Sequence, residues 1–139
     1  MAQWVIENIL ARSSRPSYPS ESVPVNEVDN WVKQVKSMGI KSIICLLRDD
    51  QLGYYTQLPE GLLIYYERQG FIIEHIPITD PNDDEQGWRE LEKKEETIYQ
   101  AFQKLPKPVL VHCSAGQQRT GRAVDYISQR WNSERSRSV

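Results

Sequence analysis

Cysteine is scarce in this chain, and so are long apolar runs and any large excess of charge. The 139 residues include 2 cysteines, too few for the disulfide scaffold of a small secreted protein. No segment approaches the roughly 20 consecutive apolar residues that cross a bilayer. The formal net charge of −2 creates no basic field for nucleic acid or an anionic membrane. We therefore expect a protein of the reducing cytoplasm that binds neither nucleic acid nor membrane.

The size and composition are those of one globular domain. Hydrophobic residues make up 39% and charged residues 26% of the chain, enough for one real core. The segment Met1–Leu10 contains Glu7 and lacks a basic start, so we expect no signal peptide. We predict a single domain over residues 1–139, acting as a monomer, with a polar and frayed tail at residues 132–139.

Short apolar runs bounded by turn residues indicate strands of a buried sheet. They are rich in branched or aromatic residues, as strands are. The three runs are Ile43–Leu47, Phe71–Ile78 and Val109–His112. Trp4–Ile6 and Ile9–Ala11 predict a short hairpin at one edge of the sheet.

Between these runs, apolar residues recur at spacings of three or four, which is typical of amphipathic helices. One pattern covers Val25–Met38, and another begins near Trp88 and ends at Pro106. Shorter patterns cover Leu62–Gln69 and Thr120–Trp131. The alternation of strand and helix predicts an α/β fold with a central, mostly parallel sheet and helices on both faces.

The segment from Val109 to Arg122, VLVHCSAGQQRTGR, is the most informative part of the chain. A predicted strand ends at His112, and the chain turns through a glycine into a helix that begins near Thr120. Ligands of open α/β sheets bind beyond the carboxyl ends of strands, and a loop leading into a helix directs several N–H groups toward an anion. We expect phosphate to contact the loop residues Ser114, Ala115, Gly116, Gln117, Gln118 and Arg119.

Cys113 opens this loop and Arg119 closes it. The planar guanidinium matches two phosphate oxygens, and positive surroundings favour the thiolate form of a cysteine, which makes Cys113 a candidate nucleophile. The hydroxyl of Thr120 can donate to the sulfur and stabilise it as a leaving group. A lone cysteine at a strand end is more often a small apolar core residue. The arginine, hydroxyl and glycine around Cys113 favour the nucleophile here.

The stretch HCSAGQQRTGR resembles the signature of the cysteine-based tyrosine and dual-specificity phosphatases, namely His-Cys, five residues, Arg, then Ser or Thr. The order of strands, an acidic loop upstream and a last helix extend the likeness to the small dual-specificity branch, from about Trp4 to Trp131. The resemblance implies this family's fold, a phosphocysteine intermediate, and no metal or cofactor. It also implies that His112 orients the loop and tunes the cysteine without acting as acid or base.

A phosphocysteine mechanism needs a general acid, because the leaving oxygen departs poorly without a proton. The acidic stretch Ile78–Asp84 follows a predicted strand directly. Asp80 lies 33 residues before the cysteine (113 − 80), close to the family's usual acid position, and nearest the strand end. Asp83 and Asp84 are the competing candidates, whose other role would be to form a turn or to cap the next helix.

Cys45 and His75 are two further candidates for a functional or structural role. Cys45, followed three residues later by Arg48, matches a cysteine that bridges the nucleophile in some oxidised lipid-phosphatase relatives. That match implies a redox partner for Cys113, although a packed core cysteine is the simpler interpretation. His75 lies within an apolar run, and we expect a structural, hydrogen-bonded ring.

The substrate class follows from length and loop composition. The chain is too short for the insertions that deepen the pocket of tyrosine-specific relatives, so we expect a shallow pocket. Such a pocket accepts phosphotyrosine and phosphoserine or phosphothreonine of proteins, or a small phosphomonoester. The loop has no lysine, unlike many relatives that act on phosphoinositides, although Arg48 and Arg122 could supply charge.

Three other functions remain open from the sequence. One is an inositol phosphate or phosphoinositide phosphatase of the same superfamily. Another is a module that binds phosphoproteins without turnover, which the set of Cys113, Arg119 and Asp80 disfavours. The third is a rhodanese-type sulfurtransferase, whose active loop is usually one residue shorter.

Overall fold

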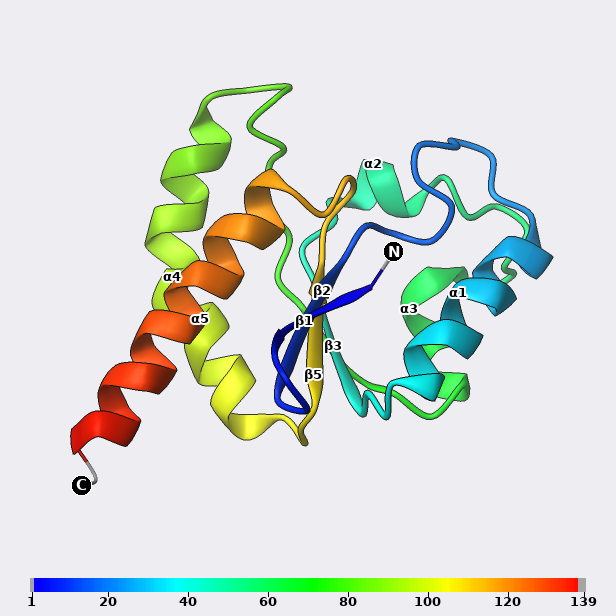
Figure 1. The fold of residues 1–139 in the computed structure, drawn as a ribbon. Coiled ribbons are helices and arrows are strands. Elements are labelled where there is room, and N and C mark those ends of the chain that lie inside the picture. Colours follow the sequence, from blue (N-terminus) through cyan, green and yellow to red (C-terminus); the bar gives the residue numbers. More distant parts are fainter. Residues whose placement is uncertain (1, 138–139) are drawn as a thin grey trace.

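The computed structural model describes residues 2–137 and contains one five-stranded sheet with the order β1-β2-β5-β3-β4 (Figure 1). The strands are β1 (Gln3–Ile6), β2 (Leu10–Ser13), β3 (Ser42–Cys45), β4 (Ile72–His75) and β5 (Val109–His112). β1 pairs with β2 in antiparallel fashion, while the β2–β5, β5–β3 and β3–β4 pairs are parallel. The prediction of a single α/β domain with a mostly parallel sheet is confirmed, as is the edge hairpin.

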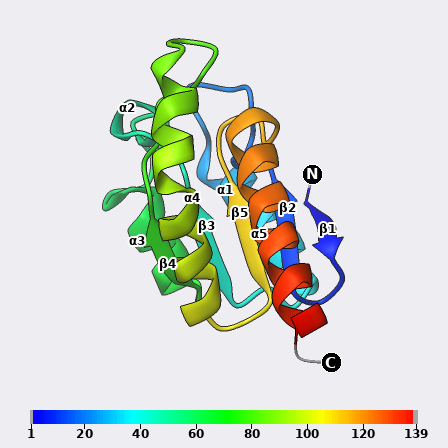
Figure 2. The same cartoon turned by 90° about the vertical axis from the view of Figure 1, so that its left-hand side faces the viewer.

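Helices cover both faces of this sheet, as predicted. The helices are α1 (Val25–Ser37), α2 (Asp49–Leu52), α3 (Gly61–Arg68), α4 (Gln86–Lys104) and α5 (Gln118–Arg137). Figures 1 and 2 show α4 and α5 on one face and α1 and α3 on the other. The short helix α2 was not predicted, because four residues are too few to display an apolar period.

The hydrophobic core consists of two clusters, one on each face of the sheet, and the central strand β5 contributes side chains to both. All four of its residues are buried, since it has a strand on each side and helices above and below. Val109 and Val111 pack in the cluster that includes α4 and α5. Leu110 points the other way, into the cluster with α1 and α3. The alternation follows from the two-residue period of a strand.

Of the three apolar runs that predicted buried strands, the one that forms β4 is not fully buried. It lies at the edge of the sheet, and its Ile72 is 51% exposed. The apolar run Phe71–Ile78 suggested burial because residues on either side of the strand are indeed in the core. Phe71 is 4%, Ile76 6% and Ile78 0% exposed.

The last helix is longer than predicted. α5 continues to Arg137, so the prediction that it ends at Trp131 and that the tail from residue 132 is frayed is wrong as far as residue 137. Contacts within and between helices hold this segment. The Tyr99 hydroxyl donates to the Glu134 carboxylate at 2.5 Å, and Arg130 pairs with Glu134 at 3.4 Å, one helical turn away. Residues 138–139 lie outside the described part.

Trp131 of α5 packs against α4. Its ring meets that of Phe102 edge-on, with 5.6 Å between the centroids.

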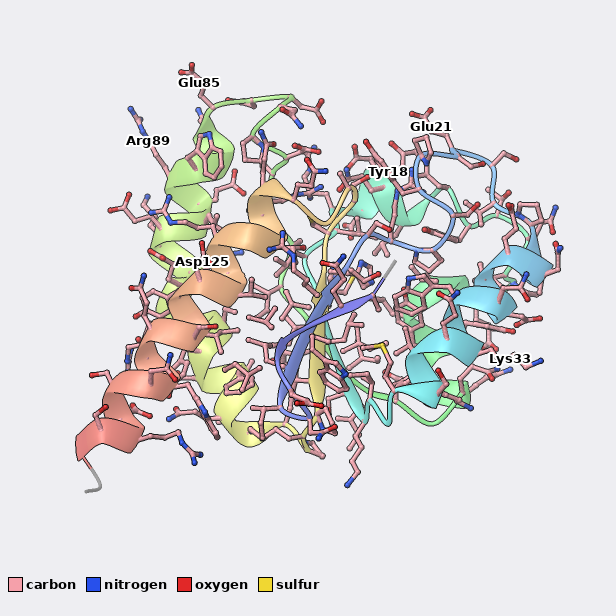
Figure 3. The ribbon with its side chains drawn as sticks, in the orientation of Figure 1. Tyr18, Glu21, Lys33, Glu85, Arg89 and Asp125 are labelled. Carbon is pink, nitrogen blue, oxygen red and sulfur yellow. The ribbon has the colours of Figure 1, made fainter. Side chains whose placement is uncertain are left out.

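None of the helices within residues 2–137 combines the length and the apolar character that a membrane span requires. The outer sides of the helices carry charged side chains, such as Lys33 on α1 and Asp125 on α5 (Figure 3).

We predict that Phe102→Ala lowers the free energy of unfolding by about 3–5 kcal/mol, because Phe102 of α4 is fully buried in the cluster that α4 forms with α5 and the sheet. Urea unfolding followed by circular dichroism measures the loss. Trp88→Ala is the control, since Trp88 is 38% exposed and its loss should change the stability by no more than about 0.5 kcal/mol. Equal effects of the two changes would contradict the assignment of the core.

Candidate active site

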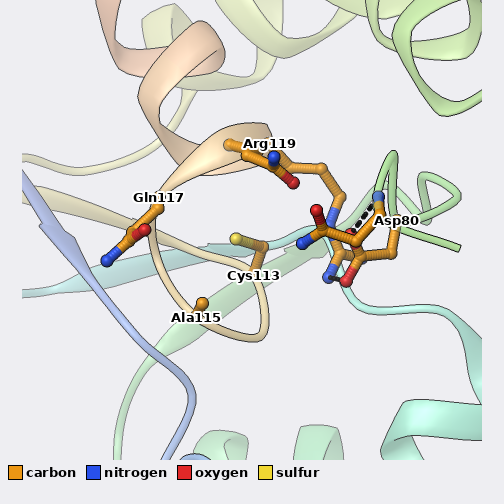
Figure 4. A pocket seen from close by; sticks show the side chains of 7 residues that line it. Asp80, Cys113, Ala115, Gln117 and Arg119 are labelled. Carbon is orange, nitrogen blue, oxygen red and sulfur yellow. Dashed lines mark hydrogen bonds and ion pairs between the residues drawn. The ribbon is translucent and has the colours of Figure 1, made fainter. Parts of the chain in front are cut away.

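A pocket of about 190 Å³ lies at the edge of the sheet where the parallel strands end (Figure 4). Its walls are formed by Asp80, Asn82, Cys113, Ala115, Gln117, Gln118 and Arg119. The structure thus brings six of the predicted residues together, although Asp80 is far from the others in sequence. Asn82 is an addition that the sequence analysis missed; its place beside Asp80 was the available signal.

The loop between β5 and α5 is held closely against the end of β2. Gly116 has a φ of +76°, and a Cβ built on it would lie 2.6 Å from the backbone carbonyl of Ser13. Only glycine fits both constraints. The Arg12 side chain donates through Nη2 to the Gly116 carbonyl oxygen at 2.8 Å. Arg12 was not predicted, and neither was its contact with the loop.

The backbone of the loop leaves donors available for an anion. Within residues 2–137, the N–H groups of residues 114–117 donate no hydrogen bond. The loop leads directly into α5 at Gln118, so the partial positive charge of the helix N-terminus adds to these donors. Ser114 does not line the pocket, because its hydroxyl accepts a hydrogen bond from Arg15 on the other side of the loop.

Cys113 lies within the curve of this loop (Figure 4) and is 2% exposed. The hydroxyl of Thr120 is also buried, and within the described residues it makes no hydrogen bond. The predicted hydrogen bond from Thr120 to the sulfur is therefore not formed in this resting state. Its donor stays available for a sulfur anion.

Arg119 is 1% exposed, and its guanidinium has two distinct edges. Nη1 donates to the Ile78 carbonyl at 3.0 Å, to the Gln51 side-chain oxygen at 2.9 Å and to the Leu46 carbonyl at 3.3 Å. Nη2 donates to Asp80 Oδ2 at 3.2 Å. Among the described residues, Nε has no hydrogen-bond partner. The edge formed by Nε and Nη2 can therefore receive an oxyanion in the bidentate manner of arginine.

Gln51 is a second residue that the sequence analysis missed. It is only 6% exposed although it is polar, and it lies on α2, the helix without a sequence signal. Its side-chain oxygen accepts from Arg119 and also, at 3.3 Å, from the backbone N–H of Arg48. Gln51 therefore orients the guanidinium and connects it to the turn after β3.

Among the three candidate acids, only Asp80 lines the pocket. Its side chain is 18% exposed, and Oδ1 accepts from the backbone N–H of Asn82 at 3.0 Å. Asp83 and Asp84 are exposed. The Asp84 carboxylate accepts from the backbone N–H of Gln86 at 2.9 Å, at the start of α4. Asp84 therefore makes a contact of the kind expected if it caps the next helix.

Two contacts with α4 fix the base of the loop that carries Asp80. Glu90 accepts from the backbone N–H of Thr79 at 2.9 Å and from its hydroxyl at 2.6 Å, and these bonds lower the pKa of Glu90. A Cβ on Gly87 would lie 2.3 Å from the Thr79 carbonyl oxygen, so only glycine allows α4 to approach this closely. The acid loop is thus anchored one residue before Asp80.

His112 is buried and its ring is fixed at both nitrogens. Nδ1 lies 3.0 Å from the Cys113 carbonyl oxygen, and Nε2 lies 3.0 Å from the Tyr66 hydroxyl. A carbonyl only accepts, so Nδ1 carries the hydrogen and Nε2 accepts from Tyr66. Burial lowers the pKa of His112 to about 4, which keeps the ring neutral. This geometry fits an orienting role. His75 is also hydrogen-bonded as expected, with Nε2 at 2.7 Å from the Leu47 carbonyl.

The two cysteines are both free and buried, and they pack on opposite faces of the sheet. Cys45 lies in the cluster with α1 and α3, and Cys113 in the cluster with α4 and α5. Burial raises the pKa of the Cys45 thiol to about 12. The disulfide between them stays a prediction.

The remaining basic candidates contribute little to the pocket. Arg48 pairs with Asp50 at 3.3 Å, and Arg122 pairs with Glu95 at 3.5 Å. Neither arginine lines the pocket. Within residues 2–137, no group of three or more His, Cys, Asp or Glu side chains is arranged to hold a metal ion.

We predict that the stability of the wild-type protein falls between pH 6.5 and pH 4 partly through His112. The unfolded histidine titrates near 6.5 and the folded one near 4, so the unfolded state binds more protons in this window. The stabilisation present above pH 6.5 is lost as the pH falls, by on the order of 3 kcal/mol.

Urea unfolding of wild type and His112→Gln at several pH values isolates this contribution, because the acidic residues titrate in both proteins. The variant should show a shallower fall across the window. The same slope in both proteins would mean that the buried ring is not neutral.

Similarity to solved structures is limited. A candidate phosphatase from Neisseria meningitidis is 21% identical over 78% of this chain, with a TM-score of 0.47. A Cys-to-Ser variant of TpbA from P. aeruginosa, in complex with phosphotyrosine, is 20% identical over 86%, with a TM-score of 0.43. The chain covers 63% and 62% of the length of these two proteins.

The sequence comparison is more specific. No curated protein matches the chain over its length or in part. Residues 81–135 match the model of the tyrosine phosphatase family, and this stretch contains α4, the signature loop and most of α5. It begins directly after Asp80. The Cys113–Arg119 loop lies within this matched stretch, so the chain is similar to the tyrosine phosphatase family in the part that forms the pocket.

Proposed function

We propose that this protein hydrolyses phosphate monoesters of proteins through a phosphocysteine on Cys113, and that it belongs to the small dual-specificity branch. The observation that carries the proposal is the pocket itself. It holds a cysteine, the guanidinium of Arg119 and the carboxylate of Asp80 beside loop N–H groups that donate to no other residue. We further propose a cytoplasmic location, which the two free thiols support, and a monomeric state.

In the first step, the phosphate lies in the loop with its oxygens on the free N–H groups and on the Nε–Nη2 edge of Arg119. The Cys113 thiolate attacks phosphorus, and the bond from phosphorus to the ester oxygen breaks. Asp80 gives its proton to that oxygen. Most of the rate acceleration comes from donors already aligned with the charge on the transferring oxygens.

In the second step, Asp80 takes a proton from water, and the water oxygen attacks the phosphocysteine. The Cys113 sulfur leaves as a thiolate and phosphate is released. Thr120 supports this departure by donating its otherwise unpaired hydroxyl hydrogen to the sulfur. His112 stays neutral throughout and holds the carbonyl of Cys113.

Asp80 pairs with Nη2 of Arg119 at 3.2 Å. A phosphate bound in the loop would share this guanidinium with Asp80, which places the carboxyl group beside the transferring phosphoryl group.

The pocket walls support protein substrates over inositol phosphates. Asp80 and Arg119 are the charged side chains among its lining residues, and Arg48 and Arg122 are paired elsewhere. A highly anionic inositol ring would find one cation in the pocket. The lining also lacks aromatic side chains that would stack on a tyrosine ring, which favours acceptance of phosphoserine and phosphothreonine as well.

The first test is release of phosphate from para-nitrophenyl phosphate, then from phosphotyrosine, phosphoserine and phosphothreonine peptides and from inositol phosphates. Formation of thiocyanate from thiosulfate, without phosphate release, would instead indicate a sulfurtransferase. Binding of phosphopeptides without any turnover would indicate a binding module. Turnover of inositol phosphates alone would contradict the proposed substrate class.

We predict that Cys113→Ser abolishes phosphate release and still binds phosphate or vanadate. The hydroxyl cannot replace the thiolate as nucleophile, but the loop N–H groups and Arg119 remain. Isothermal titration and steady-state assays measure the two properties separately. Residual turnover close to that of wild type would contradict a phosphocysteine intermediate.

We predict that Asp80→Ala slows hydrolysis of a phosphopeptide by about 10²–10⁴-fold. It should slow hydrolysis of an ester with a very good leaving group far less, because that leaving group needs no proton. Asp83→Ala and Asp84→Ala are matched controls, since both carboxylates lie outside the pocket, and their rates should stay near wild type. Equal losses on both esters for Asp80→Ala would mean that another residue is the acid.

A further inference from the structure

Arg15 is a buried arginine on the side of the signature loop opposite to Arg119. It follows β2 directly and is 2% exposed. Within the described residues it forms no ion pair with a carboxylate. A buried charge without a counterion is costly, because desolvation is not offset by a partner. Neighbouring groups must therefore stabilise the Arg15 cation. Because solvent screens a buried charge only weakly, Arg15 also acts electrostatically on these neighbours.

The hydrogen bonds of Arg15 are directed at the loop. Its Nε donates to the Ser114 hydroxyl oxygen at 3.0 Å, and its backbone N–H donates to the Ser114 carbonyl at 2.9 Å. Ser114 is the residue directly after the nucleophile. Nη1 donates to the Ser20 carbonyl at 2.7 Å and contacts the Tyr55 hydroxyl at 3.4 Å. The guanidinium thus joins the loop to the segment that follows β2.

Two aromatic rings take the place of a counterion. The guanidinium carbon lies 4.7 Å from the ring centre of Tyr54 and 5.5 Å from that of Tyr18. Figure 3 places Tyr18 at the same end of the molecule as α2 and the signature loop. Burial raises the pKa of Tyr55 to about 12, so this hydroxyl stays neutral. Within residues 2–137, the carboxylates nearest this site, those of Glu21, Asp50 and Asp83, act on the Tyr54 ring from a distance and form no ion pair with Arg15.

The other groups around Cys113 do not supply an unbalanced positive charge. Arg119 is paired with Asp80 at 3.2 Å. His112 is neutral, and Arg119 and Arg15 both contribute to the lowering of its pKa, which indicates that the field of Arg15 reaches the base of the loop. Cys45, which is paired with His112 in the neighbouring strand β3, is a neutral thiol.

We propose that Arg15 is a positioning residue for the reaction, whose unpaired charge favours the Cys113 thiolate and the bound phosphate dianion while its Nε orients Ser114. The inference rests on the proposed phosphatase function. It adds a second cation to the site, which acts from behind the loop and touches neither substrate nor sulfur.

The test follows the rate of Cys113 alkylation by iodoacetamide against pH, with mass spectrometry to separate Cys113 from Cys45. Arg15→Met should raise the midpoint of the profile by about one pH unit, the size of effect that one nearby charge produces. Arg15→Lys keeps the charge, so its alkylation midpoint should lie close to that of wild type. Arg68→Met is the control, because Arg68 is exposed on α3 and pairs with Glu60. Its midpoint should match wild type.

The acid limb of kcat/KM for para-nitrophenyl phosphate should move with the alkylation midpoint, giving about a tenfold loss below it. If Arg15→Met does not fold, Arg15→Gln serves as the neutral variant with an amide donor for Ser114. A folded neutral variant with an unchanged midpoint would overturn the proposal, and so would an equal loss of rate at every pH. If Arg15→Met shifts the midpoint while the wild-type protein releases no phosphate, the role of the Arg15 charge is supported and the proposed phosphatase function is refuted.

Discussion

The guanidinium of Arg119 connects three parts of the chain that are distant in sequence. It extends from the first turn of α5, and it donates to the ends of β3 and β4 through the carbonyls of Leu46 and Ile78, and to Gln51 on α2. Its other edge contacts Asp80. Because these acceptors are buried or half-buried, the side chain has one orientation. The pocket has its shape as a consequence.

The signature loop is supported from its other side by β2. Arg12 donates to the Gly116 carbonyl, and Arg15 holds Ser114 at both its backbone and its hydroxyl. This support is possible because β2 and β5 are parallel neighbours with Ser13 opposite His112. Their carboxyl ends therefore emerge together. The loop lies between two sets of arginine contacts, and its own N–H groups are left for a ligand.

The site combines positive charge with burial, which opposes stability. Arg15 and Arg119 are almost fully buried, and His112 is kept neutral by the same lack of solvent. An anion in the pocket would relieve this electrostatic imbalance, since it would bring negative charge to the donors.

The sequence by itself determined the α/β class, the central strand Val109–His112 and the local chemistry of the loop after it. These features depend on short-range patterns, namely apolar period, turn residues and the spacing from Cys113 to Arg119. Only the tertiary structure decided which acid faces the cysteine, the contacts of Gln51, Glu90 and Arg15, the exposed edge at β4 and the full length of α5. Each of these depends on which distant segments meet when the strands pair, and no local pattern carries that information.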